Sequence, residues 1–76
     1  MKRFDLRYLK NDFFKRMGEI IDSELQGGEV GIFLFEAGDF QNIPKSAEFI
    51  KNRGDELMNS LRFNQVDWTI AVKKRK

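Results

Sequence analysis

One uninterrupted apolar stretch constrains this chain more than any other feature: residues 29–36 read Glu-Val-Gly-Ile-Phe-Leu-Phe-Glu. Small residues bound it on both sides, Gly27-Gly28 before it and Ala37-Gly38 after it. Its short length and its β-branched and aromatic content favour a strand over a helix. Because apolar and polar residues do not alternate, both faces of this strand need cover, which predicts the central strand of a sheet.

The length and composition exclude several classes of site. A chain of 76 residues predicts one domain, residues 1–76, that buries only about 60–65% of its unfolded surface. The sequence contains neither cysteine nor histidine. Disulfides, thiol chemistry and cysteine-held zinc or iron–sulfur sites are therefore excluded, and we expect no metal. We also expect neither a signal peptide nor a membrane span, because no stretch approaches about 18 consecutive apolar residues.

The formal charge of the protein is close to balanced. The net charge is +2, and basic residues gather at Lys2-Arg3 and at Lys73–Lys76. Such runs usually serve solubility, so we predict no nucleic-acid partner. Binding of nucleic acid or of an acidic partner through Lys73–Lys76 remains the alternative, and it would depend steeply on salt.

The first part of the sequence predicts a strand and a helix. Residues 3–8 alternate polar and apolar side chains, which is typical of a short half-buried strand. Asn11 stands at an N-cap position, and Gly27-Gly28 is expected to end the helix as its C-cap. The strand directs three side chains to one side: Phe4, Leu6 and Tyr8. The helix, about four turns long, carries an apolar stripe that we assign to the core: Phe13, Met17, Ile20, Ile21 and Leu25.

The second part predicts a helix and a hairpin. Pro44 suits the first position of a helix over 44–53, Asn42 can cap it, and Gly54 is the expected C-cap. Its core-facing residues are expected to be Ala47, Ile50 and Phe49. Two strands near 56–63 and 66–74 then pair as a hairpin about Asn64-Gln65. A helix continuing through Leu57-Met58 is the alternative, and Gly54 argues against it.

The predicted fold is an α/β two-layer sandwich in the order β-α-β-α-β-β, with a mixed four-stranded sheet. Right-handed crossovers place both helices on one face, so the other face is left open. That face carries either Val30, Ile32 and Leu34 or Gly31, Phe33 and Phe35, with Trp68 as a further candidate. An apolar patch of this kind marks a binding surface. The alternative is partial cover from Met1, Phe40, Phe63 and the stems of lysine and arginine side chains.

Several short motifs resemble the TusA/SirA-like sulfur carriers. They are Asp5-Leu6-Arg7-Tyr8-Leu9, then Gly28-Glu29 before an apolar strand, and Asn42-Ile43-Pro44 followed by Phe49. The resemblance implies the fold of that family. It does not imply sulfur transfer, because the Cys-Pro pair that carries the sulfur is replaced here by Asn11-Asp12.

Two longer stretches, residues 35–40 and 56–69, resemble the short E-like subunits of bacterial respiratory complex I. The usual E subunit holds a two-iron cluster through four cysteines, which this protein lacks. The resemblance therefore implies a small accessory subunit of the electron-input module of an NADH-quinone oxidoreductase. Such a subunit would be cytoplasmic, peripheral on the inner face of the plasma membrane, and bound to other complex I subunits. A TusA-like protein-interaction domain unrelated to respiration is the alternative.

The same resemblance implies FMN as a cofactor. A flavin needs an anion site for its phosphate and an apolar slot for its ring. Helix starts near Asn11 and near Pro44 offer backbone donors. Four residues are the candidate binding set, two for the phosphate and two for the ring: Lys45, Ser46, Phe40 and Trp68. Among the acidic residues no spacing pairs two carboxylates, so we assign no catalytic residue.

Overall fold

Strand β2 (Val30–Glu36) lies inside a four-stranded sheet, between β1 (Lys2–Asp5) and β4 (Asp67–Lys73). The computed structural model describes residues 1–10, 12–38 and 40–76. Strand β1 runs parallel to β2, whereas β4 runs antiparallel to β2 and to the edge strand β3 (Glu56–Arg62). The sheet order is β1-β2-β4-β3. The predicted central position of residues 29–36 is therefore confirmed.

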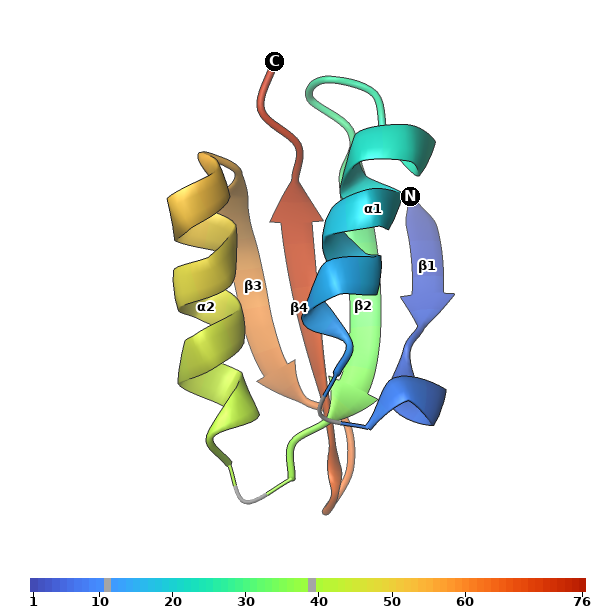
Figure 1. Cartoon of the computed structure of the whole chain (residues 1–76), viewed down its shortest axis with the longest axis vertical. Coiled ribbons are helices and arrows are strands. Elements are labelled where there is room, and N and C mark those ends of the chain that lie inside the picture. The colour runs from blue at the N-terminus through green and yellow to red at the C-terminus, as the bar shows by residue number, and fades with distance from the viewer. Residues whose placement is uncertain (11, 39) are drawn as a thin grey trace.

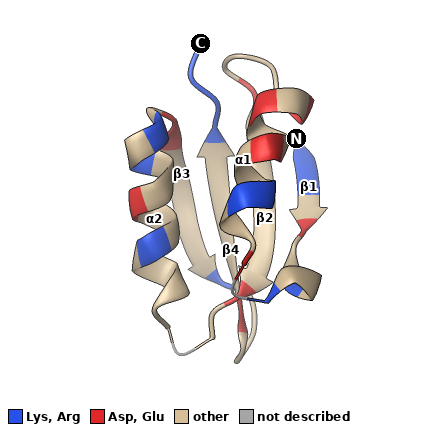
Figure 2. Cartoon of the chain, in the orientation of Figure 1, with Lys and Arg blue, Asp and Glu red and all other residues tan. Residues whose placement is uncertain are grey.

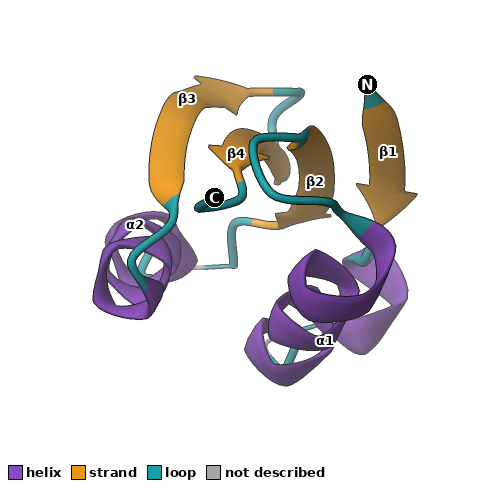
Figure 3. Cartoon of the chain, turned by 90° about the horizontal axis from the view of Figure 1, so that it is seen from above, coloured by secondary structure: helices purple, strands orange, loops and turns teal. Residues whose placement is uncertain are grey.

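Both helices lie on the same face of this sheet, as Figures 1 and 3 show. Helix α1 (Phe14–Glu24) connects β1 to β2, and α2 (Asn42–Arg53) connects β2 to β3. Strands β2 and β3 point the same way, so the two crossovers have the same sense and place their helices together. The predicted two-layer sandwich with a mixed sheet is confirmed.

The core forms where α1 packs on β2. Phe33 and Phe35 are fully buried, and the ring of Phe35 stacks on that of Phe13 with centroids 4.4 Å apart. Phe4 on β1 stacks on Phe33 at 5.2 Å. The helix contributes the whole predicted stripe, each member 3% exposed or less: Phe13, Met17, Ile20, Ile21 and Leu25.

Two predicted boundaries around α1 are wrong. The first strand ends at Asp5 and not at residue 8, because the Asp5 carboxylate accepts the backbone N–H of Arg7 at 3.0 Å and turns the chain into a 3₁₀ helix, η1 (Arg7–Leu9). Tyr8 is consequently 68% exposed. The helix itself ends at Glu24, before the two glycines, since Leu25 is extended and packs over Gly31. The predicted cap Asn11 lies outside the described residues.

Helix α2 begins two residues earlier than predicted, at Asn42. The side chain of Asn42 is buried and donates to the carbonyl of Glu36 at 3.0 Å, which fastens the helix start to the end of β2. The other end agrees with the prediction. Gly54 has φ 84°, and its N–H donates to the carbonyl of Lys51 at 3.0 Å.

The hairpin of β3 and β4 is confirmed, with one irregularity. The ladder contains a bulge at Met58, between the pairs Leu57–Val72 and Asn59–Ala71. In β4 the side of the sheet that faces the helices carries residues at every second position: Trp68, Ile70 and Val72. Trp68 is half-buried there, and its indole N–H donates to the hydroxyl of Ser60 at 2.7 Å.

The two helices meet at Gly18. A Cβ at this position would lie 3.2 Å from a guanidinium nitrogen of Arg53 and 3.3 Å from the ring of Phe49, so only glycine leaves room for both side chains. Arg53 donates to Asp22 on α1 at 2.6 Å and to the buried carboxylate of Asp55 at 3.0 Å. Burial disfavours the charged guanidinium, but these two hydrogen bonds outweigh it and raise the pKa of Arg53.

The stacked pair of Phe13 and Phe35 generates a stability prediction. Phe13→Leu should lower the free energy of unfolding by about 1–2 kcal/mol, because it removes the ring contact and leaves unfilled volume. Tyr8→Leu is the control, since Tyr8 is 68% exposed. Urea unfolding followed by circular dichroism measures both. Equal stabilities of the two variants would contradict this account of the core.

The contact between Asp22 and Arg53 generates a pH prediction. The hydrogen bond from Arg53 holds the pKa of Asp22 below its ordinary value of 3.8. The stabilisation is therefore present above that value and is lost as the pH falls through the lower folded-state pKa. Asp22→Asn should be less stable than the parent at about pH 6, and the difference should vanish under strongly acidic conditions. Glu48→Gln, which removes an exposed carboxylate, is the control. A difference that stays constant with pH would count against the ion pair.

Candidate functional site

The second face of β2 is the one that the helices leave open. Its inner residues are buried, whereas Val30, Ile32 and Leu34 on the opposite side are only half-buried. In the sheet register, Ile32 lies beside Ala71, and Leu34 lies beside Thr69. The sequence left two choices for the uncovered set, and the structure selects the aliphatic one because the larger Phe33 and Phe35 are under α1.

Strand β3 extends this surface to the sheet edge. Asn59 pairs with Ala71, and Leu61 pairs with Thr69, so these rows continue from β2 across β4. Leu61 is 55% exposed, and Phe63, just beyond the strand, is 57% exposed. We call this surface the open face, and it consists of Val30, Ile32, Leu34, Asn59, Leu61, Phe63, Thr69 and Ala71.

A shallow hollow of about 200 Å³ lies on the open face. Its centre is apolar, whereas Arg3 and Asp5 stand at its margin on β1. The complete lining is Arg3, Phe4, Asp5, Ile32, Leu34, Phe63 and Thr69. An apolar centre with a polar margin is the usual form of a protein-binding patch. Met1 and Phe40, which the alternative prediction used as partial cover, are themselves 84% and 54% exposed.

A charged cluster closes the lower end of β1 and β4. Arg7 donates to Asp5 at 2.7 Å and to the buried Asp67 at 3.2 Å, and Asn64 donates to Asp67 at 2.8 Å. The hydrogen bond from Arg7 lowers the pKa of Asp5. In turn, the bonds to Asp5 and then Asp67 raise the pKa of Arg7. Because these carboxylates are fully engaged in holding η1 against the sheet, we assign them a structural role.

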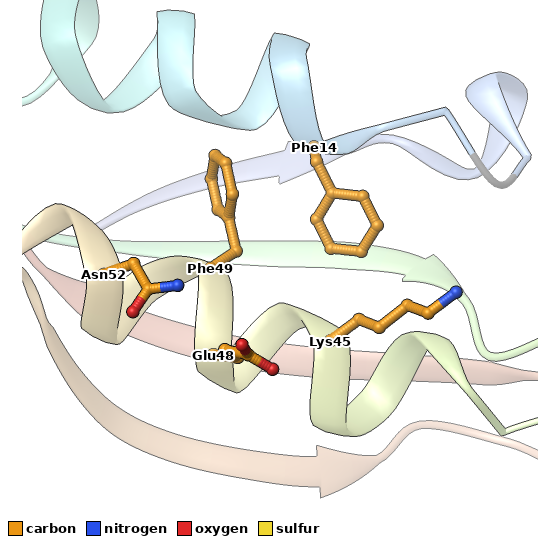
Figure 4. Close-up of a pocket in the computed structure, with 5 residues that line it drawn as sticks. All are labelled: Phe14, Lys45, Glu48, Phe49 and Asn52. Carbon is orange, nitrogen blue, oxygen red and sulfur yellow. The ribbon is translucent and has the colours of Figure 1, made fainter.

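A second concave feature lies between the helices, and Figure 4 shows it. This helix groove has a volume of about 330 Å³. Phe14 reaches into it from α1 and Phe49 from α2, with ring centroids 5.6 Å apart at 51°. The remaining lining residues come from successive turns of α2: Lys45, Glu48 and Asn52. Two rings, a cation, a carboxylate and an amide suit a flat heteroaromatic ligand with polar substituents.

The four residues predicted to bind a cofactor are distributed differently. Lys45 is exposed and lines the helix groove, as a phosphate-binding residue would require. Ser46 is fully buried, and its hydroxyl donates to the carbonyl of Ile43 at 2.7 Å, so it has its own structural partner. Phe40 is exposed in the loop before α2, with φ 70°. Phe40, Ser46 and Trp68 are not among the residues that line the groove.

Phe14 is the groove residue that sequence reasoning missed. It lies next to Phe13 but outside the apolar stripe of α1, so periodicity assigned it no role. The signal that could have identified it is its distance of four residues from Gly18. A ring and a glycine at this spacing lie on one side of a helix, which indicates close approach of another element there.

Metal-binding clusters and membrane spans are properties that the described residues allow us to check. Outside positions 11 and 39, no three acidic residues come together in the way a metal ion requires. Within the same residues, neither helix is long and apolar enough to cross a membrane.

Comparison with known proteins places this sequence near proteins of one kind. The sequence profile of the family described as the "putative NADH-ubiquinone oxidoreductase" E subunit matches residues 1–74. Among solved structures, the protein is similar to the solution structure of HP1264 from Helicobacter pylori, with 64% identity, complete coverage of both chains (100% of each) and a TM-score of 0.69. No curated protein matches the sequence at a significant level.

Proposed function

This protein belongs to the E-subunit family of NADH-ubiquinone oxidoreductase, and from that premise we propose that it is an accessory subunit that docks through its open face. The complex would be an NADH-quinone oxidoreductase, with the subunit in the electron-input part on the cytoplasmic side of the membrane. Its place there would be peripheral, held by neighbouring subunits.

The open face is the observation that supports docking. A sheet covered by helices on one side only exposes the apolar residues of its other side, and Leu61 and Phe63 are more than half exposed. A partner helix or sheet laid on this face would complete a third layer. Buried apolar area is the main favourable term in such an association.

Assembly without cluster chemistry is also what the composition favours. The protein has no cysteine to hold an iron–sulfur cluster. We therefore assign it a positioning role in the complex, with no catalytic residue of its own. The resemblance to TusA/SirA-like carriers stays a prediction about the fold, and a protein-interaction domain outside respiration is the alternative to the role proposed here.

The docking proposal predicts which variants leave the complex. Leu61→Asp and Phe63→Asp should each reduce co-purification with oxidoreductase subunits from native membranes by about tenfold, because each places a charge in an apolar interface. Tyr8→Asp, at a position that is 68% exposed and outside the open face, should co-purify normally. Circular dichroism confirms that each variant is folded.

Two results would contradict the proposal. If the unmodified protein captures no oxidoreductase subunit, the place in this complex is wrong. If it captures them and the two open-face variants do so equally well, docking uses another surface.

FMN binding is the second function we propose, and the helix groove supports it. Phe14 and Phe49 offer rings against which a flavin could stack, and Lys45 offers a cation for the phosphate near the start of α2. Ser46 does not fit this role because its hydroxyl is buried and engaged. When bound, a flavin supplies the redox chemistry, and the residues of this protein bind and orient it.

Trp68 should report on such a ligand. Phe35, its partner in the sheet register, stacks on Phe13, and the ring of Phe13 lies 4.2 Å from that of Phe14 in the groove. Direct stacking of Trp68 or Phe40 on the flavin stays a prediction from the sequence.

Titration with FMN tests this proposal. Trp68 fluorescence should be quenched, and Lys45→Glu should weaken binding by about tenfold because it removes the cation that meets the phosphate. Lys15→Glu, which makes the same charge change at an exposed position of α1, should leave the affinity nearly unchanged. Absence of quenching and of amide chemical-shift changes at millimolar FMN would exclude the proposal.

A further inference from the structure

The basic segment Lys73–Lys76, which sequence reasoning treated as a solubilising run, is an ordered part of the fold. The backbone N–H of Lys74 donates to the carbonyl of Glu29 at 2.9 Å, and the N–H of Gly28 donates to the carbonyl of Lys74 at 2.8 Å. The ammonium of Lys74 donates to the carbonyl of Leu25 at 2.8 Å. The segment therefore keeps its course beyond the end of β4, close to the turn before β2.

Arg75 is held on the other side of the same segment. Its backbone N–H donates to the buried carboxylate of Asp55 at 3.0 Å, and its guanidinium donates to the carbonyl of Arg53 at 3.0 Å. A Cβ on Gly27 would lie 3.1 Å from the Cα of Lys76, so a glycine is needed for the segment to pass this closely. These contacts hold the backbone of four consecutive basic residues in a defined course.

A hollow of about 250 Å³ lies along this segment, and Figure 2 shows the run of positive charge that follows β4. We call it the basic hollow, and its lining is Gly54, Glu56, Lys73, Lys74, Arg75 and Lys76. Within the part of the chain that the structure describes, the ammonium groups of Lys73 and Lys76 have no hydrogen-bond or carboxylate partner. The hydrogen bond from the Arg75 guanidinium goes to an uncharged carbonyl, so its charge is not neutralised there.

The basic hollow adjoins the open face. Lys73 pairs in register with Val30 on β2 and with Glu56 on β3, and it shares its side of β4 with Ala71 and Thr69. The row that contains Lys73 and Glu56 therefore borders the open face at the end where β4 finishes. A segment lying on the open face would meet these charges at one of its ends.

We propose that the basic hollow binds an acidic stretch of the protein segment that covers the open face, and that this contact sets the direction in which the segment lies. Its carboxylates pair with Lys73, Arg75 and Lys76, while its backbone N–H groups donate to Glu56. The carboxylate of Glu56 favours a peptide over a phosphate group, because a phosphate dianion brings no donor and is repelled. The proposal rests on the docking function above and adds the chemistry of the partner.

Hexaglutamate, followed by amide chemical shifts of the isolated protein, is the probe for this contact. We expect shifts at residues 73–76 and at Gly54 and Glu56, and binding that weakens steeply as salt is raised. The double variant Lys73→Glu with Lys76→Glu should bind hexaglutamate about tenfold more weakly. Lys15→Glu with Lys51→Glu changes the net charge equally at exposed helix positions and is the matched control.

Three results would overturn the proposal. The first is an equal loss of hexaglutamate binding in the two double variants, which would show a response to net charge alone. The second is an equal set of shifts with inorganic phosphate, which would identify a general anion site. The third is binding to vesicles of phosphatidylglycerol and phosphatidylcholine through the same residues with no response to hexaglutamate, which would identify a lipid surface.

The outcome is separable from that of the docking proposal. Co-purification that fails in Leu61→Asp but persists in the Lys73→Glu, Lys76→Glu variant would support docking through the open face and reject the acidic contact. Hexaglutamate binding in the basic hollow without capture of any oxidoreductase subunit would reject the complex and retain the chemistry of the contact.

Discussion

The packing of Phe33 and Phe35 beneath helix α1 decides the character of both faces of the sheet. Once these rings stack in the layer between helix and sheet, β2 must turn Val30, Ile32 and Leu34 the other way, because side chains alternate along a strand. Two helices are the only cover that the order of the described elements provides, and both lie on one side. The open face is thus a direct consequence of the core.

The space between the helices follows from a second constraint. Gly18 lets Phe49 and Arg53 approach α1 at one level, and Arg53 holds the two helices together through Asp22. Nearer the start of α1, the rings of Phe14 and Phe49 fill part of the space and leave the helix groove. The molecule therefore offers a groove on its helical side and an apolar surface on its other side. A small ligand and a protein partner could bind at the same time.

Much of the architecture was predictable from local patterns. The period-two alternation in β4, the helical stripe of α1 and the glycine that ends α2 each reflect a short-range rule of the backbone. The sequence failed at boundaries where a side chain competes with the backbone. Asp5 ends β1 by accepting the N–H of Arg7, and Leu25 leaves the helix to reach the core. Such contacts depend on neighbours that periodicity does not contain.

By itself, the sequence determined the kind of domain, the order of its elements, the exclusion of cysteine chemistry and the presence of one uncovered sheet face. Only the tertiary structure decided which residues occupy that face, that Ser46 is buried, and that Phe14 belongs to a groove. The physical reason is range. Propensity and periodicity act between residues close in the sequence, whereas exposure and concavity depend on which distant segments pack together.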